Sequence, residues 1–365
     1  GILNAISEDP IFTWMVILSA VLIALAFLLA AATVHFRFAN IRKEQAWRNL
    51  ETKWRPLANR VISGEIPASA LHQAVEPAER YFFVEFLARY ATRFERHEKA
   101  ILESLAEPYL PGIAARLDSE DPDIRSRAII TLGLLGPRKH VMALVEGLSA
   151  EEPITVLAAA RALCALEDEN AVRHVFLHIH KAELWSVSFL SRVIASAGRA
   201  AERPCREIMV DPDRSVWIRI LAVESLRKLN DFEAADLARD LILSQSDAPP
   251  GVLCACLRLL KNIGTERHLD AIRHVWGSDN DAVRTNAIAA LGGAGTRDDL
   301  PRLRLMVSDA NQWVVWSAIR GIMNLGDRDF LRDLVKAGHK AGPAAQAVLD
   351  EVSAGHEGLL QAERL

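Results

Sequence analysis

The sequence predicts an all-α fold: an α-solenoid of about seven short repeats preceded by one N-terminal transmembrane helix. Three observations support this prediction. A pair of apolar residues recurs at a nearly constant spacing, residues typical of helix ends flank many copies of the pair, and residues 11–36 contain no Asp, Glu, Lys or Arg. The first two observations indicate stacked helical units, and the third indicates a helix that crosses a membrane.

The repeat is defined by a residue, usually small, followed four positions later by a larger apolar residue. Successive copies lie 31, 31, 32, 34, 31 and 31 residues apart. Units of this length bury their apolar faces only against neighbouring units, so a constant period predicts a stack. The pairs are Ala128/Leu132, Ala159/Leu163, Leu190/Ile194, Ala222/Leu226, Cys256/Leu260, Ala287/Leu291 and Ala318/Ile322.

Residues that favour helix ends bracket these pairs. Asp121-Pro122, Asp211-Pro212 and Asp279 are expected to begin helices, because a carboxylate can accept the first free N–H groups of a helix. Glycines are expected to end helices in the left-handed conformation, namely Gly136, Gly198, Gly264, Gly295 and Gly326. Each unit is therefore predicted to contain a helix of about four turns paired with a second helix.

Two stretches share a longer pattern. Residues 124–133 read aliphatic, Arg, two residues, Ala, three residues, Leu-Gly, and residues 283–292 repeat this pattern. Residues 218–226 follow it as far as Leu226, where Arg227 replaces the glycine. The pattern resembles the second helix of the short HEAT repeat, and the resemblance covers roughly residues 111–340. It implies a helical solenoid, a fold that serves as scaffold, adaptor, transport factor and, in a few cases, lyase.

The N-terminal region is expected to anchor the chain in a membrane. The 24 residues from Ile11 to Val34 would form a helix of about 36 Å, which exceeds a hydrocarbon core of about 30 Å. A cleaved signal peptide is the alternative, but such peptides begin with basic residues and have shorter apolar regions, whereas Glu8 and Asp9 precede this one. Residues 1–10 are therefore predicted as an extracytoplasmic tail and residues 11–36 as a transmembrane helix.

Basic residues follow this segment and are absent before it. By the positive-inside rule, the large C-terminal part of this single-pass protein is expected in the cytoplasm. Contact with anionic lipid headgroups is a further role that these cations could have. The residues expected at the membrane interface are Trp14, Arg37, Arg42, Lys43, Trp47 and Trp54.

Residues 37–62 are predicted as a basic, amphipathic juxtamembrane helix. Trp47, Leu50, Trp54, Leu57 and Val61 share one apolar face, and Pro56 is expected to bend the helix. Either the rest of the chain or a membrane protein partner must cover this face, and internal packing is favoured. Residues 63–110 are predicted as a helical cap on the repeats at 111–340, and residues 341–365 as a C-terminal cap or tail.

A set of arginines occupies equivalent repeat positions. Arg161, Arg192, Arg258 and Arg320 each lie two residues after the first residue of a pair, on the side away from the core. Arg125, Arg219 and Arg284 precede the pairs by one turn and are expected to reinforce the same groove. A guanidinium suits carboxylates, so the groove is predicted to receive an acidic segment of a protein partner. That functional hypothesis competes with the favoured interpretation, in which these arginines pair with acidic residues of adjacent repeats.

Composition restricts the partners. A formal net charge of -4 and a pI near 6.3 argue against nucleic acid. Cys164, Cys205, Cys254 and Cys256 are expected as buried thiols. His174 and His178 share a helix face but lack further ligands, so neither a metal nor a cofactor is expected. Trp185, Trp313 and Trp316 are expected to pack between repeats more often than to contact a partner.

The predicted function is that of a membrane-tethered cytoplasmic scaffold or adaptor without enzymatic activity. The layout is similar to that of bacterial membrane-anchored HEAT-repeat proteins. This resemblance implies a location in the bacterial inner membrane and a membrane glycosyltransferase of exopolysaccharide synthesis as one partner. Two alternatives remain. One is an enzyme similar to HEAT-like bilin lyases, and the other is a regulatory subunit that binds an anionic ligand.

Overall fold

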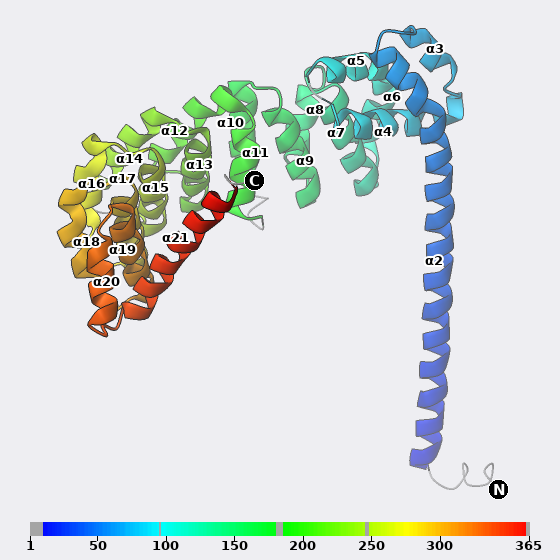
Figure 1. The fold of residues 1–365 in the computed structure, drawn as a ribbon. Coiled ribbons are helices and arrows are strands. Elements are labelled where there is room, and N and C mark those ends of the chain that lie inside the picture. The colour runs from blue at the N-terminus through cyan, green and yellow to red at the C-terminus, as the bar shows by residue number, and fades with distance from the viewer. Residues whose placement is uncertain (1–9, 95, 180–184, 245–247, 363–365) are drawn as a thin grey trace. The chain divides into compact units, whose positions relative to one another are not determined.

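The computed structural model describes residues 10–94, 96–179, 185–244 and 248–362 (Figure 1). Side chains at residues 10–13, 15, 16, 20, 30–44, 46, 96 and 353–362 lie outside the described set, although their backbone is helical. The regular elements of the described residues are all helices. The chain divides into two compact units, residues 1–113 and 114–365, and each is described by itself.

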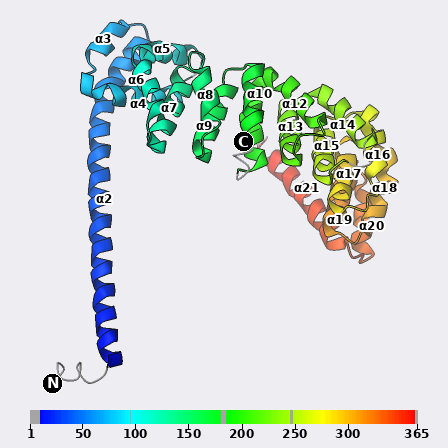
Figure 2. The same cartoon turned by 180° about the vertical axis from the view of Figure 1, so that it is seen from behind.

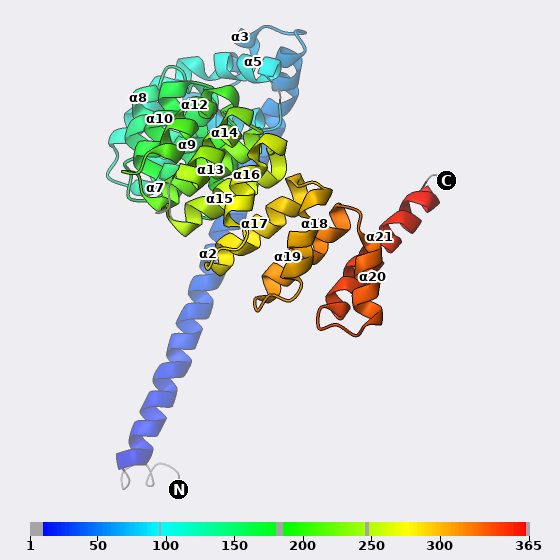
Figure 3. The ribbon, with the colours of Figure 1, turned by 90° about the vertical axis from the view of Figure 1, so that its left-hand side faces the viewer.

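The first unit contains a long helix and several short ones. Helix α2 has 53 residues and continues through Pro56, so the segments predicted at 11–36 and 37–62 form one helix. Figure 3 shows α2 as a single rod. The described elements of this unit are α2 (Pro10–Ile62), α3 (Ala68–Gln73), η1 (Pro77–Glu79), α4 (Arg80–Ala91), α5 (Arg96–Ala106), η2 (Glu107–Tyr109) and α6 (Leu110–Ala114).

The C-terminal part of α2 packs against α4. Trp54 has no exposed surface, and its ring lies 5.2 Å from that of Phe83 and 5.8 Å from that of Phe86. Ala58 is fully buried on the same face. The favoured internal packing of this face is therefore confirmed. The prediction that Trp54 lies at a membrane interface is wrong, because its side chain is fully buried against α4.

The N-terminal part of α2 exposes large apolar side chains. Trp14 is 71% exposed, Phe27 73% and Leu28 66%. Among the described residues, no helix combines the length and the apolarity needed to cross a membrane. The predicted span at 11–36 includes side chains outside the described set, and it stays a prediction.

The second unit stacks helices in two rows. The recurring apolar pairs lie on α7, α9, α11, α13, α15, α17 and α19, which we call the landmark helices, and each packs against the next (Figure 2). The landmark helices alternate with a row of connecting helices, α8, α10, α12, α14, α16, α18 and α20. This alternation is the predicted all-α solenoid of helix pairs.

The helices of the second unit have the following bounds: η3 (Ala115–Asp118), α7 (Pro122–Leu135), α8 (Val141–Gly147), α9 (Pro153–Cys164), α10 (Glu169–His178), α11 (Val187–Ala195), η5 (Gly198–Ala201), α12 (Glu202–Val210), α13 (Val216–Leu229), α14 (Phe232–Ser244), α15 (Pro250–Ile263), η6 (Glu266–His268), α16 (Leu269–Val275), α17 (Asp281–Ala294), η7 (Arg297–Asp299), α18 (Leu300–Met306), α19 (Gln312–Asn324), α20 (Arg328–Lys336) and α21 (Gly342–Ala362).

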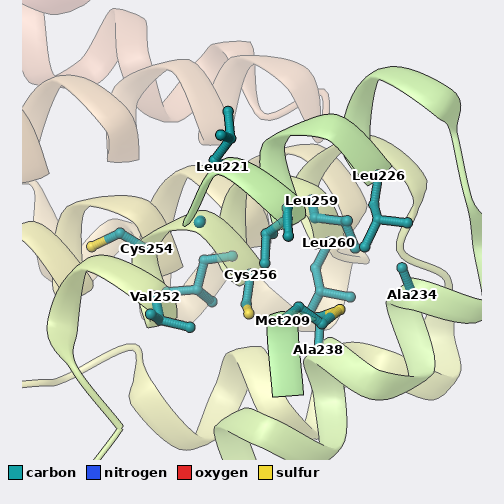
Figure 4. Packing of buried hydrophobic residues seen from close by; sticks show 14 of the residues in the cluster. Met209, Leu221, Leu226, Ala234, Ala238, Val252, Cys254, Cys256, Leu259 and Leu260 are labelled. Atoms are coloured by element: carbon teal, nitrogen blue, oxygen red, sulfur yellow. The ribbon is translucent and has the colours of Figure 1, made fainter. Parts of the chain in front are cut away.

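The apolar pairs form the core of the stack. Each of the fourteen paired residues is at most 2% exposed, including Leu190/Ile194 and Cys256/Leu260, whose neighbouring sequence departs most from the common pattern. Figure 4 shows Cys256 and Leu260 of α15 near Leu226 of α13 and Ala238 of α14. The four cysteines are buried free thiols, as predicted.

The predicted helix ends are confirmed in part. The Asp121 side chain accepts from the Asp123 N–H at the start of α7, with Pro122 at the first helical position. However, Asp211 ends α12, and Ser215 begins α13 instead, because its hydroxyl accepts from the Ile218 N–H. Asn280, adjacent to the predicted Asp279, begins α17.

The predicted glycine conformation is wrong at three of five positions. Gly198 and Gly326 have positive φ, whereas Gly136, Gly264 and Gly295 do not. Gly264 donates the last helical hydrogen bond of α15, to the Leu260 carbonyl at 2.8 Å, and its extended backbone then ends the helix. A Cβ at Gly264 would lie 2.2 Å from that carbonyl oxygen. Glycine is required there by close approach and not by a left-handed backbone.

Candidate partner-binding surface

The arginines predicted for the groove separate into three groups. The first group, Arg125, Arg219 and Arg284, turns back toward the loop or helix before its own landmark helix. Arg125 Nη1 donates to the Ser119 carbonyl at 2.7 Å, and Arg284 Nη1 donates to the Ser278 carbonyl at 2.6 Å. Arg219 is only 3% exposed and donates to the Met209 carbonyl at 3.0 Å. These residues hold the two helices of a repeat together, so their predicted role in an open groove is corrected.

Arg284 also joins two repeats. Its Nε lies 2.9 Å from Asp309 Oδ2, in the loop before the next landmark helix, and its Nη2 lies 2.7 Å from Asp281 Oδ1. The hydrogen bonds that Arg284 donates to Asp309 raise the pKa of Arg284 and lower the pKa of Asp309. Both shifts favour the charged forms, so this pair stabilises the step between α17 and α19.

The second group forms ion pairs with acidic residues of neighbouring helices, as the favoured interpretation predicted. Arg258 Nε donates to Glu224 Oε1 at 2.7 Å, and Arg227 bonds the other oxygen of Glu224 at 2.7 Å. Burial raises the pKa of Glu224, but the hydrogen bonds from Arg227 and Arg258 outweigh it, and the pKa lies below its ordinary value. Arg320 Nη2 bonds both oxygens of Glu351 at 2.8 Å.

The third group is Arg161 and Arg192, on the adjacent landmark helices α9 and α11. Both side chains are exposed, and the described residues offer neither guanidinium an acidic partner. Arg161 Cζ lies 5.9 Å and Arg192 Cζ 6.0 Å from the centroid of the Phe189 ring. Trp185 stacks on the same ring at 5.3 Å. We call these four residues the cationic patch.

Local capping fixes the ring at the centre of this patch. Ser186 begins α11, and its hydroxyl accepts from the Phe189 N–H at 3.2 Å. Leu190, the next residue, is fully buried and anchors the helix in the stack. The first turn of α11, which carries the ring, is therefore capped and anchored, and among the described residues neither nearby guanidinium has an acidic partner for its N–H donors.

A second set of arginines was missed by the sequence analysis. Arg206 pairs with Asp231, Arg239 with Asp270, Arg273 with Asp299 and Arg304 with Asp327, each across a step between connecting helices. Arg173 pairs with Glu207 in the same way. The five arginines recur at nearly the repeat period, which is a signal the sequence contains. This arginine–acid ladder is internally satisfied and stabilises the stack.

The predicted membrane-interface residues differ in their surroundings. Trp47 is half-buried, with the Arg89 guanidinium 4.4 Å above its ring and Phe82 beside it. Trp14 is exposed and Trp54 is buried, as described above. The side chains of Arg37, Arg42 and Lys43 lie outside the described residues.

The structure offers no evident site for a metal within the residues it describes, since no three His, Cys, Asp or Glu side chains form a suitable group there. His178 Nδ1 lies 3.4 Å from Ser149 Oγ. Burial raises the pKa of Cys164 and of Cys256 to about 12, so both thiols stay protonated at neutral pH.

Comparisons with curated proteins and with solved structures found only engineered proteins of low sequence identity among the structures reported below. No curated protein matches the chain. A crystal structure of an engineered protein from the Northeast Structural Genomics Consortium is 16% identical, with a TM-score of 0.30, and the match covers 60% of this chain and 97% of that one. A second such structure is 15% identical, with a TM-score of 0.30, and the match covers 71% of this chain and 80% of that one.

The family comparison is more specific. The model of HEAT repeats matches residues 110–185 and residues 242–322. Landmark helices α11 and α13 lie between these two regions, and their buried apolar pairs keep the same arrangement. The fold is typically that of a non-enzymatic scaffold, and no catalytic family is indicated. The chain therefore carries HEAT repeats in residues 110–185 and 242–322.

Proposed function

We propose that the chain is a scaffold that binds an acidic segment of a protein partner through the cationic patch. HEAT repeats generally mediate protein–protein interaction, which supports a scaffold. The observation that carries the finer proposal is the contrast among the arginines. Arg258, Arg284 and Arg320 are engaged by acidic residues, whereas Arg161 and Arg192 have no such partner among the described residues.

The chemistry of the patch supports a carboxylate ligand. Two guanidinium groups on adjacent helices can each present paired N–H donors to a carboxylate. Phe189 and Trp185 add an apolar surface next to these charges, and aromatic and arginine side chains are common among residues that dominate binding energy. An acidic segment with one large apolar side chain would satisfy both parts.

We further propose that α2 tethers this scaffold to the bacterial inner membrane, with the repeats in the cytoplasm. The exposed Leu22, Ile23 and Phe27 support lipid contact, because large apolar side chains seldom face water in such numbers. Tethering would raise the local concentration of the patch toward other membrane proteins. On the resemblance given above, the proposed partner is a membrane glycosyltransferase of exopolysaccharide synthesis.

Co-purification tests the partner proposal. The detergent-solubilised chain would be compared with Arg161→Glu/Arg192→Glu and with the control Arg138→Glu/Arg199→Glu. The control changes the net charge equally at two exposed arginines outside the patch. We expect a membrane protein to co-purify with the parent and the control but not with the patch variant. Equal recovery with all three would refute the role of the patch.

Membrane extraction tests the tether. Washing membranes with alkaline carbonate releases peripheral proteins, whereas a chain held by an apolar helix stays in the pellet. We expect the full chain to stay in the pellet and a chain lacking residues 1–36 to appear in the supernatant. Release of the full chain would contradict the tether and leave the patch proposal standing.

A further inference from the structure

A cavity of about 550 Å³ lies at the last step of the second unit. Trp313 and Trp316 of α19 line one wall, and the loop before α21, with His339 and Lys340, lines the other. Trp313 is 72% exposed, which is unusual for the largest apolar side chain. The volume is in the range of about 300–1,000 Å³ that is common for ligand sites.

The repeat register explains why this step is open. One repeat earlier, Arg284 and Asp309 form the ion pair that closes the step between α17 and α19. The residues 31 positions further along are Val315 and Lys340, in register with Ala287 and Ala318. An arginine–aspartate pair is thus replaced by a short apolar side chain and a cation, which cannot bridge the two elements.

One of the charged side chains that line the cavity has no ion-pair partner among the described residues. Asp309, which lines the cavity, is already bonded to Arg284. His339 Nδ1 accepts the Ala341 N–H at 3.1 Å, so this nitrogen carries no proton in that bond. Lys340 is exposed, and none of the described residues forms an ion pair with it. Of the two charged side chains that line the cavity, Asp309 is therefore paired with a guanidinium, whereas Lys340 has no counter-ion among the described residues.

We infer that this cavity, the tryptophan cavity, binds a short acidic peptide that inserts a large apolar side chain between Trp313 and the loop before α21. A neighbouring carboxylate of the peptide pairs with Lys340. The two tryptophans supply the apolar contact, and the missing arginine leaves the space for it. This inference rests on the proposed function, since it requires a protein partner, and it deepens that function by assigning to this chain a second site that contacts the partner.

The test uses the full chain in detergent and a defined probe, the capped tripeptide Glu-Phe-Glu. Lys-Phe-Lys and Glu-Ala-Glu serve as control peptides for charge and for the apolar side chain. We expect Glu-Phe-Glu to bind best by calorimetry. Val315→Arg/Lys340→Asp restores the pair found one repeat earlier and should abolish binding by filling the step.

A second variant keeps the inference falsifiable if that double variant does not fold. Trp313→Ala changes an exposed side chain and should weaken binding about 30-fold, as expected for a dominant aromatic contact. Undiminished binding in this folded variant would overturn the inference, as would equal binding of the three peptides. Arg161→Glu/Arg192→Glu should bind the tripeptide normally, so failure of the cationic patch is distinguished from failure of this cavity.

Discussion

Arg273 provides the sharpest test of the arginine–acid ladder. Its Nε and Nη2 bond the two oxygens of Asp299 at 2.7 and 2.9 Å, and the Asp299 side chain has no exposed surface. Changing Arg273 to Ala leaves this buried carboxylate with the Thr296 N–H and Arg302 as remaining partners. Removing one member of a buried ion pair lowers the free energy of unfolding by about 3–5 kcal/mol. Because two partners of Asp299 remain, we expect a loss at the lower end, about 3 kcal/mol.

The loss should depend on pH in a defined direction. Burial raises the pKa of Asp299, but the hydrogen bonds from Arg273 and the Thr296 N–H outweigh it, so the folded pKa lies below its ordinary value. Stability from such a carboxyl is present at neutral pH and is lost as the pH falls through the folded pKa. In Arg273→Ala the pKa of Asp299 rises, and the deficit should shrink as the pH falls toward and below the ordinary aspartate pKa of 3.8, where Asp299 is protonated.

Urea unfolding of the full chain in detergent would measure this effect. Arg332→Ala is the matched control, because Arg332 pairs with the exposed Asp329 and should contribute at most about 1 kcal/mol. The reasoning is refuted if Arg273→Ala and Arg332→Ala unfold at the same urea concentration. It is also refuted if the Arg273→Ala deficit grows as the pH falls.

Three further predictions concern the cores. Gly292→Ala should lower stability by about 1–3 kcal/mol in urea unfolding, because its Cβ would lie 2.4 Å from Gly321 Cα, whereas Gly277→Ala, with open space around it, should not. Cys164 and Cys256 should resist iodoacetamide in the folded chain at neutral pH, as followed by mass spectrometry, because burial raises the pKa of each thiol to about 12; rapid labelling would contradict their burial. Trp54→Ala should cost about 3–5 kcal/mol by thermal or urea unfolding, because it removes a buried ring. Trp54→Phe should cost less, because it keeps an aromatic ring and removes an indole N–H that has no partner among the described residues; equal losses would argue against this packing.

Much of the fold could be predicted because the stack repeats one physical requirement. A small residue lets neighbouring helices approach, and a larger one four positions later fills the space between them, so the apolar pairs define the register even where the arginine of the pattern is missing. Glycine conformation could not be predicted in the same way. Gly264 and Gly295 end helices without positive φ, because a nearby carbonyl oxygen, and not backbone handedness, excludes a side chain.

The candidate site was predicted less well. Position in a helix indicated that Arg161 and Arg192 face away from the core, and both are exposed. It could not reveal that Arg284 would bond the Ser278 carbonyl and Asp309, because those partners lie in loops whose path is set by tertiary packing. The open step at Val315 was also hidden, since it becomes visible only once Arg284 and Asp309 are known to close the step before it.

The most direct test of the account is the binding of an octaglutamate peptide to the cationic patch, measured by calorimetry on the full chain in detergent. The account predicts binding to the parent and to Arg138→Glu/Arg199→Glu, weakened by added salt. It predicts that folded Arg161→Glu/Arg192→Glu loses this binding. Equal affinity of the peptide for all three proteins would contradict the claim that these two arginines form the partner-binding surface.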